Sequence, residues 1–221
     1  MKNTQSKVKN IFRFIIPKNV RLFLWSLKPK IHLLNTYKLQ REELILDLKN
    51  INDKYIIREI TWADEAKIRK AYQFRGRKAF RNLIPARMNS GNWIGLAVID
   101  NITGDIAYLA WIIVKSIRYF EEFGIYLKPG QFLLKDGFCV PEYRHQGLHT
   151  RMEQERINYC IKNGAKDIFI QIQDENEKGK DSVRNNGYVL INKKYVIAWP
   201  VFNTYRVFRS FLRNPFMKVI S

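Results

Sequence analysis

Phe138-Cys139-Val140-Pro141-Glu142-Tyr143-Arg144-His145-Gln146-Gly147-Leu148-His149-Thr150-Arg151-Met152 is the stretch that decides the fold of this chain. Its apolar start ends at Pro141, which has no N–H group to donate to a strand ladder, so a strand should stop there. After a short polar turn, Gly147 leads into a run with apolar residues at helical spacing. The stretch is therefore predicted to be a strand, a tight basic loop and a helix.

The loop before this helix has the chemistry of an anion-binding site. The first N–H groups of a helix have no partner inside the helix and lie at the positive end of its dipole. A diphosphate can accept hydrogen bonds from these groups. Gly147 lets the backbone approach such a ligand with no side chain in between. We therefore expect the loop to hold a phosphate-bearing ligand.

These residues resemble the pyrophosphate loop of the GNAT superfamily, the acyl-CoA-dependent N-acyltransferases. The family pattern is Gln or Arg, two residues, Gly, one residue, then Gly or Ala; here it reads Arg144-x-x-Gly147-x-His149. His149 departs from the pattern, because the family prefers a residue with little or no side chain at this position. Its imidazole either crowds the diphosphate or lies beside it as an additional donor.

A second stretch is similar to the motif that follows in the same family. It reads Asn176-x-x-Gly179-x-x-x-Val183-x-x-x-Gly187-Tyr188, against the family's Asn-x-x-Ala-x-x-x-Tyr-x-x-x-Gly-Phe. The small residue and the closing Gly-aromatic pair agree in spacing. Val183, however, stands where many members carry the tyrosine thought to protonate the departing thiolate.

The order of the expected elements also agrees with this resemblance. Apolar alternation predicts strands near 55–60, 93–99, 106–114, 131–140, 167–173 and 189–200. Helical spacing predicts helices near 64–74, 78–83, 148–163 and 176–186. The resemblance implies the α/β GNAT fold, with a mixed central sheet of about six to seven strands flanked by helices.

The net charge of +19 is concentrated at the two ends of the chain. Residues 1–41 contain ten Lys or Arg and no acid, and residues 182–221 contain seven and no acid, leaving 22 basic and 20 acidic residues between them. A nearly neutral middle argues against nucleic-acid binding across the fold. We expect a basic amphipathic N-terminal extension (1–50), a GNAT acyltransferase domain (51–200) and a basic amphipathic C-terminal tail (201–221).

Both ends interleave basic residues with Phe, Ile, Leu and Tyr or Trp, as segments at a membrane interface do. In the tail, Tyr205, Phe208, Phe211 and Leu212 would share one helical face. No uncharged run reaches the roughly 18–20 residues of a membrane span, and no signal-peptide cleavage site follows. The two cysteines suit a reducing compartment. We therefore expect a cytoplasmic protein whose ends bind an anionic inner membrane face, or pack on the domain or on a partner subunit.

The resemblance implies acetyl-CoA as cosubstrate, lying where the central strand and the next strand separate. Pantetheine would pair with the main chain near the end of the central strand, and the diphosphate would take N–H groups from the loop. The expected cofactor-binding residues are Phe138, Cys139, Val140, Arg144, His145, Gln146, Gly147, Leu148, His149 and Asn176.

An amine would attack the thioester directly, with a central-strand N–H stabilising the oxyanion. A base or a water relay must take the amine proton near pH 7. Asp136 is the first candidate, because strand alternation puts it on the same face as Phe138 and Val140. Glu122, or its neighbour Glu121, is the second.

Since valine cannot donate a proton, the acid is Tyr188, Tyr143 or solvent. His145 and His149 have the i, i+4 spacing of metal ligands, but no third ligand is evident, so no metal site is expected.

The expected activity is acetyl-CoA-dependent N-acetylation of a primary amine. An amino sugar in surface-glycan biosynthesis is one acceptor class, suggested by the basic-aromatic ends; a peptide N-terminus, lysine or small amine is another. A third interpretation is a CoA-binding module that has lost catalysis, suggested by His149 and Val183. The sequence leaves the acceptor, the acyl chain length and the oligomeric state open.

Overall fold

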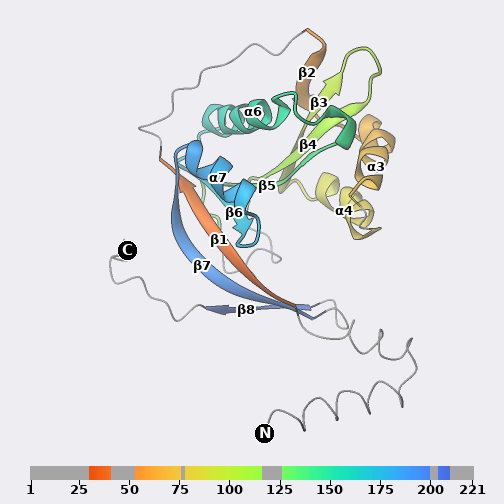
Figure 1. Cartoon of the computed structure of the whole chain (residues 1–221). Coiled ribbons are helices and arrows are strands. Elements are labelled where there is room, and N and C mark those ends of the chain that lie inside the picture. Colours follow the sequence, from red (N-terminus) through yellow and green to blue (C-terminus); the bar gives the residue numbers. More distant parts are fainter. Residues whose placement is uncertain (1–29, 41–52, 76–77, 116–125, 200–203, 210–221) are drawn as a thin grey trace, which may run out of the picture. The chain divides into compact units, whose positions relative to one another are not determined.

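The computed structural model describes residues 30–40, 53–75, 78–115, 126–199 and 204–209 (Figure 1). The chain divides into two compact units, and the larger one is Asn35–Lys193. The smaller unit combines Met1–Leu34 with Lys194–Ser221, so it takes the outer ends of two strands. The expected extensions fall mostly outside the described residues, and their boundaries stay predictions.

The larger unit is built on a mixed seven-stranded sheet with four α-helices. Its strands lie in the order β2-β3-β4-β5-β6-β1-β7. The pairs from β2 to β5 are antiparallel, and β5 and β6 are parallel. The strands are β1 (Lys30–Leu39), β2 (Tyr55–Glu59), β3 (Trp93–Asp100), β4 (Ile106–Ile113), β5 (Gln131–Cys139), β6 (Asp167–Gln173) and β7 (Tyr188–Trp199). The helices are α3 (Glu65–Gln73), α4 (Lys78–Asn89), α6 (Leu148–Lys162) and α7 (Glu177–Asn185).

Strand β4 is the centre of the core, because all eight of its residues are buried. Its side chains alternate between two apolar clusters, as the period of a strand requires. Tyr108, Ala110 and Ile112 belong to the cluster that also takes residues of α6 and α7. Leu109 and Trp111 belong to the cluster that takes residues of α3 and α4. Figure 1 shows the same division, with α3 and α4 on one side of the central strands and α6 and α7 on the other.

The helices and inner strands confirm the expected α/β order, but two strands were not expected. Residues 30–39 fall in the predicted N-terminal extension and instead form β1, whose residues Tyr37 and Leu39 join the core. The sequence hides this strand because its buried polar residues find partners only in the fold: the Asn35 side-chain amide donates to Asp174 Oδ1 at 2.7 Å.

The C-terminal tail also contains a strand where helical spacing was predicted. Residues Thr204–Arg209 form β8, which pairs antiparallel with residues 194–199 of β7 in the smaller unit. A helical face through Tyr205 and Phe208 is therefore wrong, because this segment is a strand. Phe211 and Leu212 lie outside the described residues.

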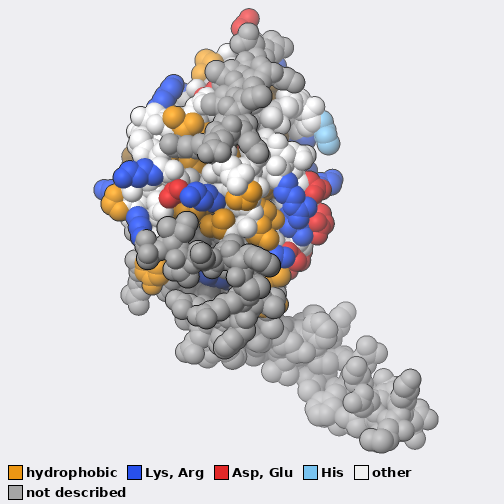
Figure 2. All heavy atoms as spheres, turned by 90° about the vertical axis from the view of Figure 1, so that its left-hand side faces the viewer, with side chains coloured by type: hydrophobic (Ala, Val, Ile, Leu, Met, Phe, Trp, Pro, Cys, Tyr) orange, Lys and Arg blue, Asp and Glu red, His pale blue; other side chains and the backbone are white. Residues whose placement is uncertain are grey.

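None of the helices in the described ranges is long and apolar enough to cross a membrane. On the described part of the face seen in Figure 2, Lys and Arg side chains lie beside Asp and Glu side chains. This mixture agrees with the near-neutral charge of the middle of the sequence.

Candidate functional site

Strands β5 and β6 separate part of the way along their length. Their parallel pairing runs from Gln131 with Asp167 to Leu134 with Ile170. Beyond this point β5 continues to Cys139 and β6 to Gln173 without a paired register. In this part of the sheet the two strands do not pair with each other, and the Lys135 carbonyl of β5 accepts a hydrogen bond from Arg156 Nη1 at 3.3 Å instead.

A β-bulge lies at the start of the separated segment. Leu109 pairs with Phe138, and Trp111 pairs with Lys135, so β5 contains one residue more than β4 across this interval. Asp136 lies in the bulge and has a φ of 48°, a left-handed conformation that is uncommon for a residue other than glycine. The extra residue interrupts the regular pairing of β5 with β4 next to the point where β5 and β6 separate.

A cavity of about 130 Å³ fills the gap between the strands. Residues of β5 and β6 form two of its walls, and the first turns of α6 and residues of α7 form the others. The polar and charged residues that line it are Lys135, Asp136, His149, Glu153, Arg156, Gln171, Asn176, Ser182 and Asn186.

The loop from Arg144 to Gly147 forms the entrance to α6. Gly147 is the N-cap of the helix and has a φ of 73°, a left-handed conformation that glycine adopts without strain. The first amide to close a helical turn is that of Arg151, which donates to the Gly147 carbonyl at 3.2 Å. The amides before it point out of the helix end, as an anion site requires.

The loop is attached to the domain at its C-terminal end. Leu148 is buried in the cluster under α6, and the Gln146 side-chain oxygen accepts a hydrogen bond from the Tyr55 hydroxyl of β2. Arg144 and His145 are exposed, and His145 has a positive φ of 62°. The expected diphosphate-binding residues are therefore gathered in one open turn at the end of the cavity helix.

The three expected pantetheine contacts differ in what their backbones can offer. The Val140 amide donates to the Ala107 carbonyl of β4 at 3.0 Å, so it is not available to a ligand. Because antiparallel strands send alternate residues' amides to opposite edges, Phe138 also faces β4 and Cys139 faces the gap. Cys139 is thus the residue of the three that is best placed for main-chain pairing with a ligand.

His149 lies in the cavity wall rather than across the loop. Its Nδ1 atom is 2.6 Å from the Tyr108 hydroxyl, and its Nε2 atom is 3.1 Å from Ser182 Oγ. The residue as a whole is exposed, but partial desolvation of the ring lowers its pKa; Glu153 opposes this effect and Arg156 adds to it. The ring is thus turned away from the outward-pointing amides of the loop.

Asp136 is held by two arginines from the α3 and α4 side of the sheet. The Arg87 guanidinium forms an ion pair with it, and Arg75 Nη2 lies 3.8 Å from Asp136 Oδ1. Burial raises the pKa of Asp136, but Arg87, Lys135 and Arg75 outweigh it, so the net pKa is below the usual value. A carboxylate held in this way is a weak proton acceptor, and the geometry does not favour Asp136 as the base.

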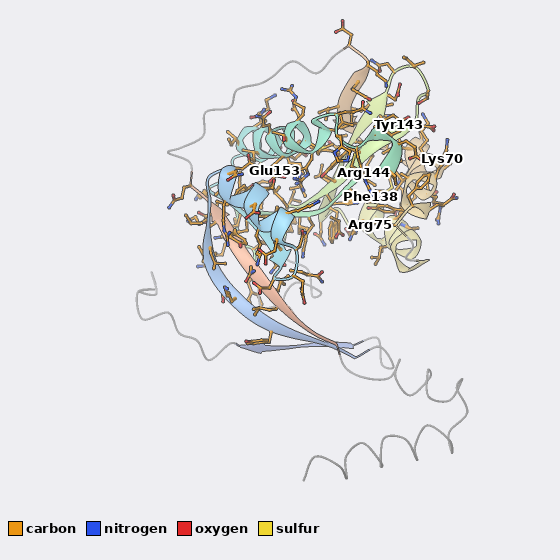
Figure 3. All side chains as sticks on the ribbon, in the orientation of Figure 1. Lys70, Arg75, Phe138, Tyr143, Arg144 and Glu153 are labelled. Carbon is orange, nitrogen blue, oxygen red and sulfur yellow. The ribbon has the colours of Figure 1, made fainter. Side chains whose placement is uncertain are left out.

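The arginines are themselves packed on aromatic rings. The Arg87 guanidinium lies 4.2 Å from the Trp93 ring centre and 5.1 Å from that of Trp111. Arg75 lies 5.4 Å from the Phe138 ring centre, and Figure 3 shows these two side chains together beside the end of β5. The face of β5 opposite the cavity is thus basic and aromatic.

Neither Tyr188 nor Tyr143 lines the cavity. The Tyr188 hydroxyl donates to Glu153 Oε1 at 2.9 Å, and burial raises its pKa well above the usual value, so it is a poor acid. Tyr143 lies in the 3₁₀ turn Pro141–Tyr143, with its hydroxyl 3.3 Å from Thr103 Oγ1. Glu121 and Glu122 lie outside the described residues.

Asn176 has a structural role in the cavity wall. It is the N-cap of α7, and its Oδ1 atom accepts a hydrogen bond from the Gly179 amide at 3.0 Å. A Cβ atom at Gly179 would come within 2.6 Å of the Asn176 side chain, so the two residues are in close contact at the start of α7.

Several residues of the site were not predicted as functional. Lys135 lines the cavity, and burial lowers its pKa to about 8. Ser182 precedes Val183 on α7, Arg75 lies in the turn after α3, and Arg87 lies on α4 beyond the expected helical range 78–83. None of them occupies a defined position of a motif, so only their places around the cavity and the bulge identify them.

No family model matches the sequence, and no curated protein does so. Solved structures do match the fold. A GCN5-related N-acetyltransferase from Sphaerobacter thermophilus is 13% identical, with a TM-score of 0.56 over 87% of this chain and 56% of that chain. A putative acetyltransferase from the GNAT family of Novosphingobium aromaticivorans is 12% identical, with a TM-score of 0.52 over 76% and 64%.

A tandem GNAT protein from the clavulanic acid biosynthesis pathway is 9% identical, with a TM-score of 0.59 over 82% of this chain and 58% of that chain. The chain spans less than two thirds of the length of each of these three proteins. The identities are low, but the common architecture is clear: the chain has the GNAT fold.

Proposed function

We propose that this protein is an N-acetyltransferase that transfers an acetyl group from acetyl-CoA to a primary amine. One observation carries the proposal: on the GNAT fold, β5 separates from β6 beside a cavity whose wall includes the first turns of α6. A ligand with an extended amide chain and a terminal diphosphate fits this combination of open strand edge and helix N-terminus.

The residues present are suited to such a ligand. Cys139 offers backbone groups at the open edge of β5, and the amides before Arg151 point toward a diphosphate. Arg144 adds a cation at the exposed side of the loop. When bound, acetyl-CoA would supply an activated thioester. The protein would orient this thioester, limit water in the cavity and accept the proton that the amine loses.

The bulge is the proposed place of reaction. Gly137 is exposed there and lines the cavity, while Asp136 and Phe138 turn toward Arg75 on the other face. The acceptor amine would approach at Gly137, whose backbone borders the Tyr108 hydroxyl. Since Asp136 is paired with arginines, we assign the amine proton to a relay of water or hydroxyl groups rather than to this carboxylate.

An amino sugar used in surface-glycan assembly is the acceptor class that we place first, and a peptide N-terminus, lysine or small amine is second. The basic-aromatic ends of the sequence support the first class, because they suit a site at an anionic membrane surface. On this proposal the protein works in the cytoplasm and binds the inner membrane face peripherally. No nucleic-acid role is proposed.

Calorimetry with acetyl-CoA, followed by an acceptor panel, tests this function. We expect binding in the micromolar range, a higher melting temperature with the ligand, and CoA release with at least one amine. The panel should contain amino-sugar nucleotides, free amino sugars, peptides and polyamines. No binding at millimolar acetyl-CoA contradicts the proposal; binding with no CoA release from any amine favours a CoA-binding module without catalysis.

A further inference from the structure

Three side chains from separate elements form one hydrogen-bonded chain in the wall of the cavity. The Tyr108 hydroxyl of β4 is 2.6 Å from His149 Nδ1, and His149 Nε2 on α6 is 3.1 Å from Ser182 Oγ on α7. His149 and Ser182 line the cavity, and Tyr108 lies behind them in the core. The chain thus connects the interior of the sheet with the cavity.

The direction of the hydrogen bonds follows from the burial of Tyr108. Burial raises the pKa of its hydroxyl far above the usual value, so Tyr108 keeps its proton and donates it to His149 Nδ1. The neutral imidazole then carries its own hydrogen on Nε2 and donates it to Ser182 Oγ. The Ser182 hydroxyl hydrogen remains for an acceptor in the cavity.

The charged groups near His149 do not change this arrangement. Glu153 and Arg156, on the same face of α6, form an ion pair with each other, and Glu153 also accepts the Tyr188 hydroxyl. With burial, their net effect lowers the pKa of His149. The imidazole is therefore neutral at pH 7 and can accept a proton at one nitrogen while it gives one up at the other.

The Tyr108 end of the chain reaches the proposed reaction centre. A Cβ atom built on Gly137 would lie 2.6 Å from the Tyr108 oxygen, so this hydroxyl borders the bulge in β5. Val183, the next residue after Ser182, has no proton to give and packs in the core. One end of the chain, the Tyr108 hydroxyl, thus borders the bulge, and the other end, Ser182, lines the cavity.

We propose that Tyr108, His149 and Ser182 carry the proton that the acceptor amine loses to the sulfur of the departing thiolate. The inference rests on the proposed acetyl transfer and adds its proton path. Ser182 is the residue that would touch sulfur, and Tyr108 the one that would face the amine.

The step balances in atoms and electrons. The amine nitrogen forms a bond to the acyl carbon, the C–S bond breaks with its electron pair on sulfur, and sulfur takes the Ser182 hydroxyl proton. Ser182 takes the Nε2 proton of His149, Nδ1 takes the Tyr108 proton, and Tyr108 takes the proton from nitrogen. Every residue ends neutral, and His149 ends in its other tautomer, which exchange with water restores.

The proton path is tested without an acceptor, by titrating the thiol of bound CoA through its thiolate absorbance. A Ser182 donor beside sulfur stabilises the thiolate, so we expect the pKa of the bound thiol to rise by about one unit in Ser182→Ala, a tenfold smaller thiolate fraction. Ser182→Thr should restore the wild-type value. Asp181→Asn, an exposed change on the neighbouring residue of α7, should leave it unchanged.

The outcomes separate this inference from the proposed function. Wild-type protein that does not bind CoA in calorimetry overturns both. CoA binding with the same thiol titration in wild type and Ser182→Ala overturns the proton path alone. With an amine from the acceptor panel, Ser182→Ala should lower kcat about 100-fold and change the KM for acetyl-CoA less than about threefold. A rise in KM as large as the fall in kcat would contradict the path.

Discussion

The backbone of Gly137 lies directly against the Tyr108 hydroxyl: a Cβ atom at this glycine would come within 2.6 Å of the oxygen. We expect Gly137→Ala to displace Tyr108 and to lower the free energy of unfolding by about 1–3 kcal/mol, measured by urea denaturation. The next Tyr108 atom lies 3.5 Å away, so removing the oxygen restores the space. Gly137→Ala should therefore cost much less in a Tyr108→Phe background; equal costs in both backgrounds would contradict the contact.

Asp136 is expected to stabilise the fold rather than to act as the base. Its replacement by Asn leaves the Arg87 guanidinium, which is 8% exposed, without its carboxylate. Because Asp136 itself is about one-quarter exposed, we expect a loss of about 2 kcal/mol, below the range for a fully buried pair. Glu65→Gln, which breaks the exposed pair with Arg69, is the control and should cost at most about 0.5 kcal/mol. If Asp136→Asn leaves the stability unchanged and shifts the pH–rate profile, Asp136 acts as the base instead.

A carboxylate in the first turn of α6 should affect stability and CoA binding in opposite directions. Thr150 is exposed two residues after the start of the helix. Thr150→Glu places a negative charge at the positive end of the dipole, which should stabilise the free protein by about 0.3–1 kcal/mol. The same charge repels a diphosphate, so the Kd for CoA should rise about tenfold relative to Thr150→Gln, the neutral isostere. Equal Kd values for the two variants would place the diphosphate elsewhere.

Asp64 should make stability depend on pH below about pH 4. Arg58 donates to both of its carboxylate oxygens, at 2.8 and 2.7 Å, and this bidentate pair lowers the pKa of Asp64 to about 2. Because the folded pKa lies below the unfolded value, the stabilisation is complete above the unfolded pKa and is lost as the pH falls through the folded one. The shift corresponds to roughly 2 kcal/mol.

Urea denaturation of wild type and Asp64→Asn between pH 7 and pH 2.5 measures this term. The stability difference between the two proteins should be constant from pH 7 to about pH 5 and should shrink below about pH 4. A difference that stays constant down to pH 2.5 would show that Asp64 does not carry the low pKa.

The basic N-terminal residues should increase binding to anionic membranes. Because β1 belongs to the sheet, this test keeps the full chain and replaces Lys7, Lys9, Arg13 and Lys18 by Gln. At about 1 kcal/mol per charge near the surface, we expect sedimentation with phosphatidylserine vesicles to fall at least tenfold. The control carries the same changes at Lys128, Lys162, Lys166 and Lys178, which are exposed in the larger unit. Equal losses in both variants would assign the binding to net charge.

The sequence was most informative where chemistry is local. Pro141 ends a strand, Gly147 opens a helix, and Asn176 caps another, and each of these follows from the backbone of the residue itself. With the alternation of apolar residues, these signals predicted the order of the inner elements and the anion loop. They could not reveal β1, because a basic strand with buried Asn35 is stable only beside its partners in the sheet.

The roles of the site residues depended on contacts across the sheet. The sequence around Asp136 does not show that two arginines pair with its carboxylate. In the same way, the sequence around His149 does not show that its ring meets Tyr108 and Ser182 rather than a phosphate. The sequence by itself thus determined the strand, the loop and the helix of the proposed diphosphate site, because helix ends and turns are set by neighbouring residues. The tertiary structure alone decided which side chains meet at the bulge, because burial and partners distant in sequence control pKa and hydrogen bonding.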